Sequence, residues 1–122
     1  MKIKRINSIL YCDKWQQTVA FYKRVLHCPV SMENEWFVEF KVAPGACLSV
    51  ADAAHTSMQS SGGQGLTISL QVEDAARARQ ELLEMGFEPT EVRSLWGADV
   101  VYVWDPEGHR LEFWSEGEGE EG

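Results

Sequence analysis

Four polar residues occupy corresponding places in two similar halves of this chain: Asn7 corresponds to Thr67, and Ser49 corresponds to Glu112. Of the four, Glu112 is the one with an ionisable side chain. A carboxylate that faces a cleft among amide and hydroxyl groups can accept a hydrogen bond from a ligand or act as a general base. We therefore take Glu112 as the candidate catalytic residue. The alternative, which the sequence leaves open, is a carboxylate that pairs with Arg110 or with water.

The halves repeat one order of elements. Residues 1–52 and residues 66–115 each read as a strand, a helix and three further strands, and the polar segment 53–65 links them. Opening strands are related by an offset of 60 residues and closing strands by 63. Unrelated segments rarely share element order and turn position, so duplication is the expected origin. The predicted fold class is α+β, with two βαβββ modules around a cleft, and residues 116–122 are expected to form a disordered acidic tail.

The spacing of apolar residues sets the elements of each half. In the first half, Trp15, Val19 and Tyr22 recur at helical spacing after Asp13, the expected N-cap, and the helix should end near His27. In the second half, Glu73 or Asp74 should cap a helix that stops at Gly86. The expected strands cover residues 6–12, 30–33, 35–42 and 46–51, then 66–72, 91–95, 100–104 and 110–114.

Strand alternation predicts which side chains face the cleft. Ile68 and Leu70 should pack on their own helix, which turns Thr67 and Gln71 to the concave face. Aromatic residues lie on or beside the same strands, and flat walls suit a planar or cationic small molecule. Each aromatic residue has an alternative role in the core. The candidate ligand-binding residues are Asn7, Tyr11, Ser49, Thr67, Gln71, Trp36, Tyr102, Trp104 and Trp114.

Composition narrows the class of partner. The net charge is −8, half of it from the glutamates of the tail, and no basic stripe is present to neutralise phosphates, so no nucleic-acid partner is expected. No apolar run is long enough to cross a bilayer, so no membrane partner is expected. The N-terminal residues read as the start of a strand rather than a signal peptide. Three cysteines without paired spacing predict free thiols in the cytoplasm.

Three stretches carry a resemblance to a known group of proteins. They are a strand that runs into Asp13 and a helix with Ala20-Phe21-Tyr22, then Val72-Glu73-Asp74-Ala75-Ala76, and above all the terminal hairpin Asp105-Pro106-Glu107-Gly108-His109-Arg110-Leu111-Glu112-Phe113. The pattern resembles the vicinal oxygen chelate superfamily of glyoxalase I, bleomycin-resistance proteins and extradiol dioxygenases. The resemblance implies a concave half-barrel sheet with helices outside, commonly in a homodimer.

In metal-dependent members of that superfamily, a histidine opens the first strand of each module and a carboxylate closes the last. The matching positions here are Asn7, Thr67, Ser49 and Glu112, and only Glu112 keeps a ligand of the usual kind. Neutral amide and hydroxyl oxygens bind transition metals weakly, so no metal and no cofactor are expected. The three histidines share no ligand spacing and are expected to be solvated.

The resulting hypothesis is a protein that sequesters an amphipathic or aromatic small molecule in the cleft between the modules. The alternative is a lyase, isomerase or dioxygenase of the same superfamily, resembling lactoylglutathione lyase, with Glu112 as base or metal ligand. A structural or regulatory module, in which the homodimer interface matters more than the cavity, is the third hypothesis.

Overall fold

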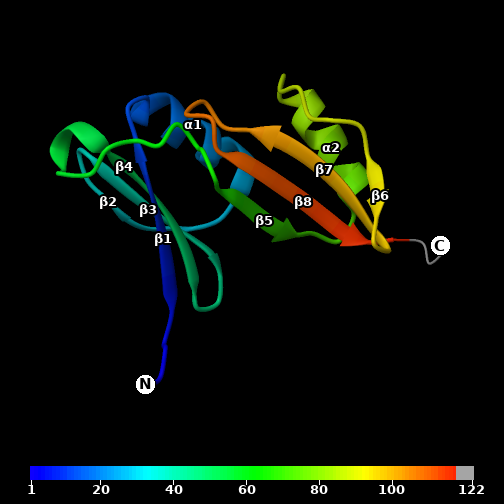
Figure 1. Ribbon diagram of the computed structural model, residues 1–122, viewed down its shortest axis with the longest axis horizontal. Helices are drawn as coiled ribbons and strands as arrows, with labels where there is room; N and C mark the ends of the chain where they lie inside the picture. Colours follow the sequence, from blue (N-terminus) through cyan, green and yellow to red (C-terminus); the bar gives the residue numbers. More distant parts are fainter. Residues whose placement is uncertain (118–122) are drawn as a thin grey trace. The chain divides into compact units, whose positions relative to one another are not determined.

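The computed structural model describes residues 1–117. The chain divides into two compact units, with the boundary after Gly63, inside the segment that the sequence assigns to the linker. Each unit contains a four-stranded mixed sheet and an α-helix (Figure 1). The predicted α+β fold with two βαβββ modules is confirmed. The cleft between the modules, and the half-barrel formed by both, stay predictions. Within residues 1–117, no helix is long and apolar enough to cross a membrane.

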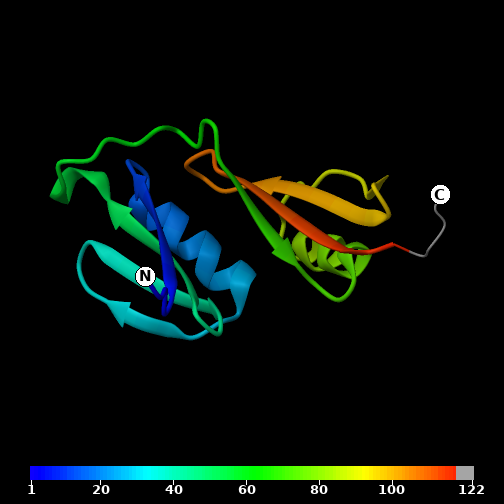
Figure 2. The same ribbon diagram turned by 60° about the horizontal axis from the view of Figure 1, so that its bottom comes forward.

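Unit 1 follows the expected order of elements closely. It consists of β1 (Ile6–Cys12), α1 (Trp15–Leu26), β2 (Val30–Glu33), β3 (Phe37–Ala43), β4 (Ala46–Asp52) and a short 3-10 turn (Ala53–His55). The strand order is β1-β4-β3-β2, in which β1 runs parallel to β4 and the other pairs are antiparallel. Figure 2 shows α1 lying along one face of this sheet.

The core of unit 1 forms between α1 and the sheet. Tyr22 is fully buried, and its ring lies 5.1 Å from Phe21 and 6.2 Å from Phe40 of β3. The helix starts one residue later than predicted, because Lys14 rather than Asp13 is the N-cap residue, and Lys14 makes no side-chain capping bond. The indole Nε1 of Trp15 instead donates to the Val50 carbonyl oxygen at 2.9 Å. This bond ties the first turn of the helix to β4.

Unit 2 repeats the plan with β5 (Thr67–Gln71), α2 (Ala75–Glu84), β6 (Arg93–Leu95), β7 (Ala98–Trp104) and β8 (Arg110–Glu116), in the order β5-β8-β7-β6. β5 runs parallel to β8. β8 extends one residue into the segment expected to be a disordered tail, because Glu116 pairs with Ala98 of β7. The rest of that predicted tail, 118–122, lies outside the described residues.

Buried polar groups fix both ends of β8. At its end, the Ser115 hydroxyl accepts a hydrogen bond of 2.9 Å from the Ala75 amide. At its start, the Asp105 carboxylate accepts bonds of 2.9 Å from the amides of Glu107, Gly108 and His109. The His109 ring lies 2.8 Å from the same carboxylate, and it is 2% exposed. The expectation that His109 is solvated was therefore wrong, because it belongs to the turn that starts β8.

Candidate functional site

A polar cluster lies on the face of the first sheet that is opposite α1. Phe40 faces α1, so its neighbour Glu39 faces the other way. The Ser49 hydroxyl donates to Asn7 Oδ1 at 2.7 Å, and Asn7 Nδ2 donates to Glu39 Oε2 at 3.0 Å. The Ser31 hydroxyl completes the cluster with a bond of 2.7 Å to Glu39 Oε1. Predicted residues Asn7 and Ser49 thus do meet, but they bond to each other and to a third residue.

Glu39 is the residue of this cluster that sequence reasoning missed. It is 8% exposed, and Ser49, its partner in the β3–β4 register, is fully buried. The Arg5 guanidinium nitrogen Nη1 lies 3.6 Å from Glu39 Oε1. The signal available in the sequence was a carboxylate directly between the apolar residues Val38 and Phe40. Because a buried carboxylate needs partners, such a charge predicts a polar cluster.

A second polar cluster lies on the second sheet, on the face opposite α2. The Glu112 carboxylate accepts a hydrogen bond of 2.5 Å from the Ser69 hydroxyl on β5 and one of 3.0 Å from the Tyr102 hydroxyl on β7. The Arg110 guanidinium lies 4.5 Å from the centre of the Tyr102 ring and donates to Thr67 Oγ1 at 3.0 Å. Glu112 is therefore held by neutral hydroxyl donors, while Arg110 contacts a ring and a hydroxyl.

The hydroxyl of Tyr102 is a stable donor at neutral pH. Burial of the phenol raises its pKa above the ordinary value of 10.0, and the hydrogen bond to Glu112 and the negative charge of that carboxylate raise it further. A carboxylate offers about four acceptor positions, so with two hydrogen bonds made Glu112 can still accept one from a ligand.

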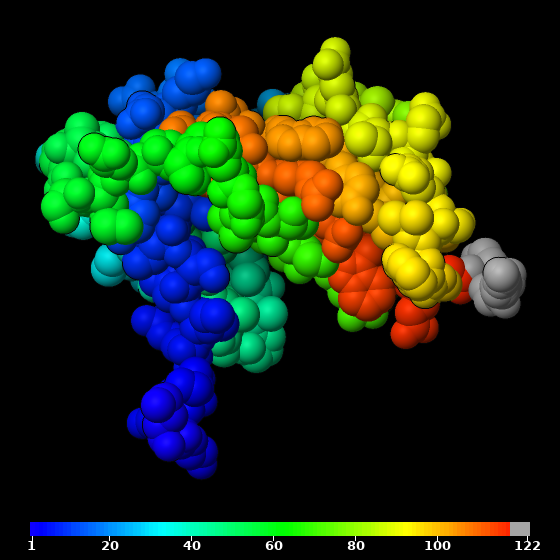
Figure 3. Space-filling view, in the orientation of Figure 1, coloured from blue at the N-terminus to red at the C-terminus, as the bar shows by residue number. Residues whose placement is uncertain are grey.

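A cavity of about 440 Å³ opens beside Glu112, and every residue that lines it belongs to unit 2. Its walls come from β7, β8 and the β6–β7 hairpin, which lie side by side at the surface in Figure 3. Tryptophan and tyrosine rings supply much of the lining, together with one carboxylate and the hydroxyls of Ser69 and Tyr102. The lining residues are Ser69, Leu95, Trp96, Ala98, Val100, Tyr102, Glu112 and Trp114.

Of the predicted site residues, the cavity brings together Glu112, Tyr102 and Trp114. Thr67 is not a lining residue, and its hydroxyl accepts a hydrogen bond from Arg110. The remaining predicted residues lie elsewhere. Trp104 is half exposed and does not line the cavity. Trp36 and Tyr11 belong to unit 1, where Tyr11 is partly exposed. Gln71 lines a different recess. Trp96 and Ser69 line the cavity, although neither was in the predicted set.

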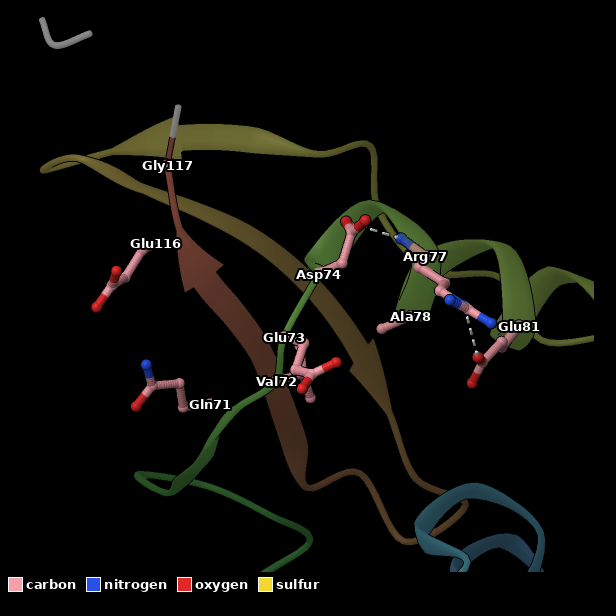
Figure 4. A pocket seen from close by; sticks show the side chains of 9 residues that line it. All are labelled: Gln71, Val72, Glu73, Asp74, Arg77, Ala78, Glu81, Glu116 and Gly117. Carbon is pink, nitrogen blue, oxygen red and sulfur yellow. Dashed lines mark hydrogen bonds and ion pairs between the residues drawn. The ribbon is translucent and has the colours of Figure 1, made fainter. Parts of the chain in front are cut away.

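The recess that includes Gln71 is wider and mainly acidic (Figure 4). Two of its carboxylates, those of Asp74 and Glu81, have structural roles on α2. Asp74 is the N-cap of α2 and accepts from the amides of Ala76 and Arg77, and the Arg77 guanidinium nitrogen Nε lies 3.7 Å from Glu81. This recess therefore mostly reflects capping and pairing along one helix.

The sequence comparison now decides the family. A model of the glyoxalase-like domain matches residues 7–114. The chain belongs to the glyoxalase-like domain family. The matched region runs from Asn7 to Trp114 and so spans both modules, including both polar clusters. No curated protein has a sequence that matches this chain.

Solved structures of glyoxalase-like proteins share the fold at low sequence identity. A lactoylglutathione lyase from Agrobacterium tumefaciens superposes with a TM-score of 0.74 at 17% identity, over 90% of this chain and 91% of that one. A glyoxalase/bleomycin resistance protein/dioxygenase from Nocardioides superposes with a TM-score of 0.72 at 20% identity, over 99% of this chain and 87% of that one. For a bleomycin resistance determinant encoded on transposon Tn5, the TM-score is 0.70 at 14% identity, over 92% of this chain and 97% of that one.

The metal-ligand positions of metal-dependent glyoxalase-like proteins do not fit a metal in this chain. Asn7 and Ser49 bond to each other, and Thr67 accepts from Arg110. Both Glu112 oxygens accept bonds from hydroxyls. Within residues 1–117, no three His, Cys, Asp or Glu side chains gather as a metal site needs. Neutral amide and hydroxyl oxygens, such as those of Asn7, Ser49 and Thr67, are weak donors for zinc, nickel or iron.

Proposed function

We propose that this glyoxalase-like protein binds an amphipathic or aromatic small molecule without a metal ion. The observation that carries the proposal is the cavity of about 440 Å³ in unit 2, which combines aromatic walls with the carboxylate of Glu112. Its volume is in the range of about 300–1,000 Å³ that is usual for small-molecule sites. The superfamily resemblance supports the same class of function, since bleomycin-resistance proteins belong to it.

The chemistry of the cavity favours a flat ligand that carries a cationic or hydrogen-bonding group. Trp114 offers ring surface, on which planar and cationic groups bind well, while Arg110 of the same chain lies over the Tyr102 ring. Glu112 offers a negative charge, and its two recorded donors, Ser69 and Tyr102, are neutral. The nearby Arg110 does not line the cavity. A planar aromatic cation is therefore expected to bind more tightly than a planar aromatic anion.

Two fluorescent probes test this proposal. Acridine orange is a planar aromatic cation, and 8-anilinonaphthalene-1-sulfonate is an aromatic anion. We expect acridine orange to bind more tightly, as measured by its fluorescence anisotropy. Glu112→Gln should raise the Kd of the cation about tenfold, because the charge at the site is lost. The matched control is Glu88→Gln, an exposed carboxylate outside the cavity. If neither probe binds, or if both variants behave alike, the proposed function is wrong.

A second candidate function is catalysis, with Glu112 as the general base. The observation that favours it is the position of the Glu112 carboxylate in the wall of a cavity that a substrate could enter. This function would be supported if the purified native protein forms lactoylglutathione and the Glu112→Gln variant does not. Turnover that is equal in the native and Glu112→Gln proteins would contradict the role of Glu112 as base.

A further inference from the structure

Trp96 occupies a strained position at the tip of the β6–β7 hairpin. Leu95 and Ala98 are the last paired residues, so Trp96 and Gly97 form a two-residue turn. Both have positive φ angles, 55° and 79°. Such turns favour Asn-Gly, because asparagine and glycine adopt this conformation readily. A bulky aromatic residue there is a genuine outlier. Tryptophan is thus a poor choice for the turn itself.

The Trp96 side chain is also fully exposed, at 100% of its reference surface, although it lines the Glu112 cavity. Within residues 1–117, its ring has no recorded ring contact or hydrogen bond. Trp36, at the corresponding β2–β3 connection of unit 1, differs clearly. It is partly buried, stacks on His55 at 6.3 Å and packs edge-on against Phe37 at 5.5 Å. Trp36 therefore has a packing role, whereas Trp96 has none in the unliganded protein.

We propose that Trp96 is a specificity-determining residue of the Glu112 cavity, the outer aromatic wall that stacks on the flat face of a bound ligand. This inference rests on the proposed function. A ligand that covers the indole ring would remove its apolar surface from water and add a second aromatic wall to that of Trp114. Backbone strain of this kind is typical of binding sites, where it persists because it serves the ligand.

The inference predicts opposite effects on stability and on binding. Trp96→Asn gives the turn the Asn-Gly sequence that it favours, so we expect the Tm to rise by a few degrees. The same change should raise the Kd for acridine orange about two- to tenfold, because an aromatic wall is lost. Thermal unfolding measures the first effect, and anisotropy of the probe measures the second. A residue with a purely structural role would not move the two in opposite directions.

Two further variants act as controls. Trp96→Phe keeps an aromatic ring and the strained φ angle, so its Tm should stay unchanged and its Kd should stay within about twofold of native. Trp104→Thr removes a tryptophan that is 50% exposed on β7 and does not line the cavity, so its Kd should not change.

Each result decides between the inference and the proposed function. Equal Kd values for native and Trp96→Asn proteins, with weaker binding by Glu112→Gln, would overturn the role of Trp96 and leave the proposed function intact. Absence of probe binding by the native protein would overturn both. If Trp96→Asn instead abolishes self-association in sedimentation velocity and leaves the Kd unchanged, Trp96 anchors a second copy of the chain and the inference is wrong.

Discussion

The two modules carry the same pair of chemical groups on neighbouring strands, but in the opposite order. Unit 1 has a carboxylate on β3 and a hydroxyl on β4, in the register pair Glu39 and Ser49. Unit 2 has a hydroxyl on β7 and a carboxylate on β8, in the register pair Tyr102 and Glu112. Both members of one pair lie 63 residues after those of the other. The two modules therefore hold the polar pair at the same position, with the carboxylate and the hydroxyl exchanged between the two strands.

The surroundings of the two pairs differ as well. Glu39 and Ser49 are 8% and 0% exposed, and Asn7 bridges them. Glu112 and Tyr102 are partly exposed and line a cavity. A carboxylate surrounded by its own chain stabilises the fold, whereas one at a cavity can bind something else. The polar groups of unit 1 are therefore bonded to one another, whereas those of unit 2 lie at a cavity, where the proposed ligand would reach them.

Exchange of the side chains between corresponding positions gives the largest expected effect. Ser49→Glu would place a larger, charged group at a fully buried position beside Glu39. We expect the free energy of unfolding to fall by at least about 3 kcal/mol, from overpacking and an unpaired buried charge. The reverse change, Glu112→Ser, should lower the free energy of unfolding by about 1 kcal/mol, because the hydroxyls of Ser69 and Tyr102 can donate to water in the cavity instead.

Urea unfolding measures both changes in free energy. Equal effects of Ser49→Glu and Glu112→Ser would mean that the two faces are equally closed, and the comparison would fail. Circular dichroism of each folded variant checks that its secondary structure is retained, so that the free energies refer to the same fold.

The order of elements was predictable because it depends on local signals. β2 was expected at Val30–Glu33 and has those bounds, and Asp74 was one of two expected caps. The first residue of α1 was predicted less well: the N-cap residue is Lys14 instead of Asp13, and Trp15 bonds to a carbonyl of β4, 35 residues away, a contact that no local signal contains.

The candidate site was predictable in part for the same reason. Strand alternation pointed to Glu112 and Trp114, and the aromatic residues on the cavity strands pointed to Tyr102; these three do line one cavity. Strand alternation could not reveal Trp96, because the sequence Trp-Gly is no signature of a turn with two positive φ angles. Glu39 was overlooked because the resemblance directed attention to the last strand of each module, while the buried carboxylate of unit 1 lies one strand away.

An intermediate effect is expected when the carboxylate of unit 1 is removed. Glu39→Ala deletes the acceptor of bonds from Asn7 and Ser31. We expect unit 1 to lose about 2–3 kcal/mol of unfolding free energy, since buried donors are left without partners. The ion pair with Arg5 adds little, because the Arg5 side chain is 56% exposed. Urea unfolding measures this loss.

Binding provides the contrast for Glu39. Glu39→Gln is the matched control, because it keeps an acceptor for Asn7 and should cost about 1 kcal/mol or less. Neither Glu39 variant should change the Kd for acridine orange, whereas Glu112→Gln should. If Glu39→Ala raises the Kd for acridine orange as much as Glu112→Gln does, the division between a structural and a binding carboxylate is contradicted.

The smallest expected effect is the pH dependence that Tyr102 contributes. Its pKa is raised by burial first, and then by the bond to Glu112 and the charge of Glu112. The folded protein therefore holds this proton more tightly than the unfolded chain does. The resulting stability is present below the ordinary tyrosine pKa of about 10 and is lost as the pH rises through the raised value. Tyr102→Phe should accordingly lose less stability than the native protein between about pH 9 and pH 12.

Ultraviolet titration separates the causes of this shift. The native curve minus that of Tyr102→Phe isolates one of the three tyrosines. In Glu112→Gln the charge is gone, so the pKa of Tyr102 should move back toward its ordinary value, while the effect of burial remains. Glu39→Gln should leave the Tyr102 curve unchanged, since Glu39 is not among the groups that raise its pKa. If Glu112→Gln leaves the Tyr102 titration curve unchanged, the hydrogen bond from the Tyr102 hydroxyl to the Glu112 carboxylate does not persist in solution. The polar pair of unit 2 would then no longer correspond to that of unit 1.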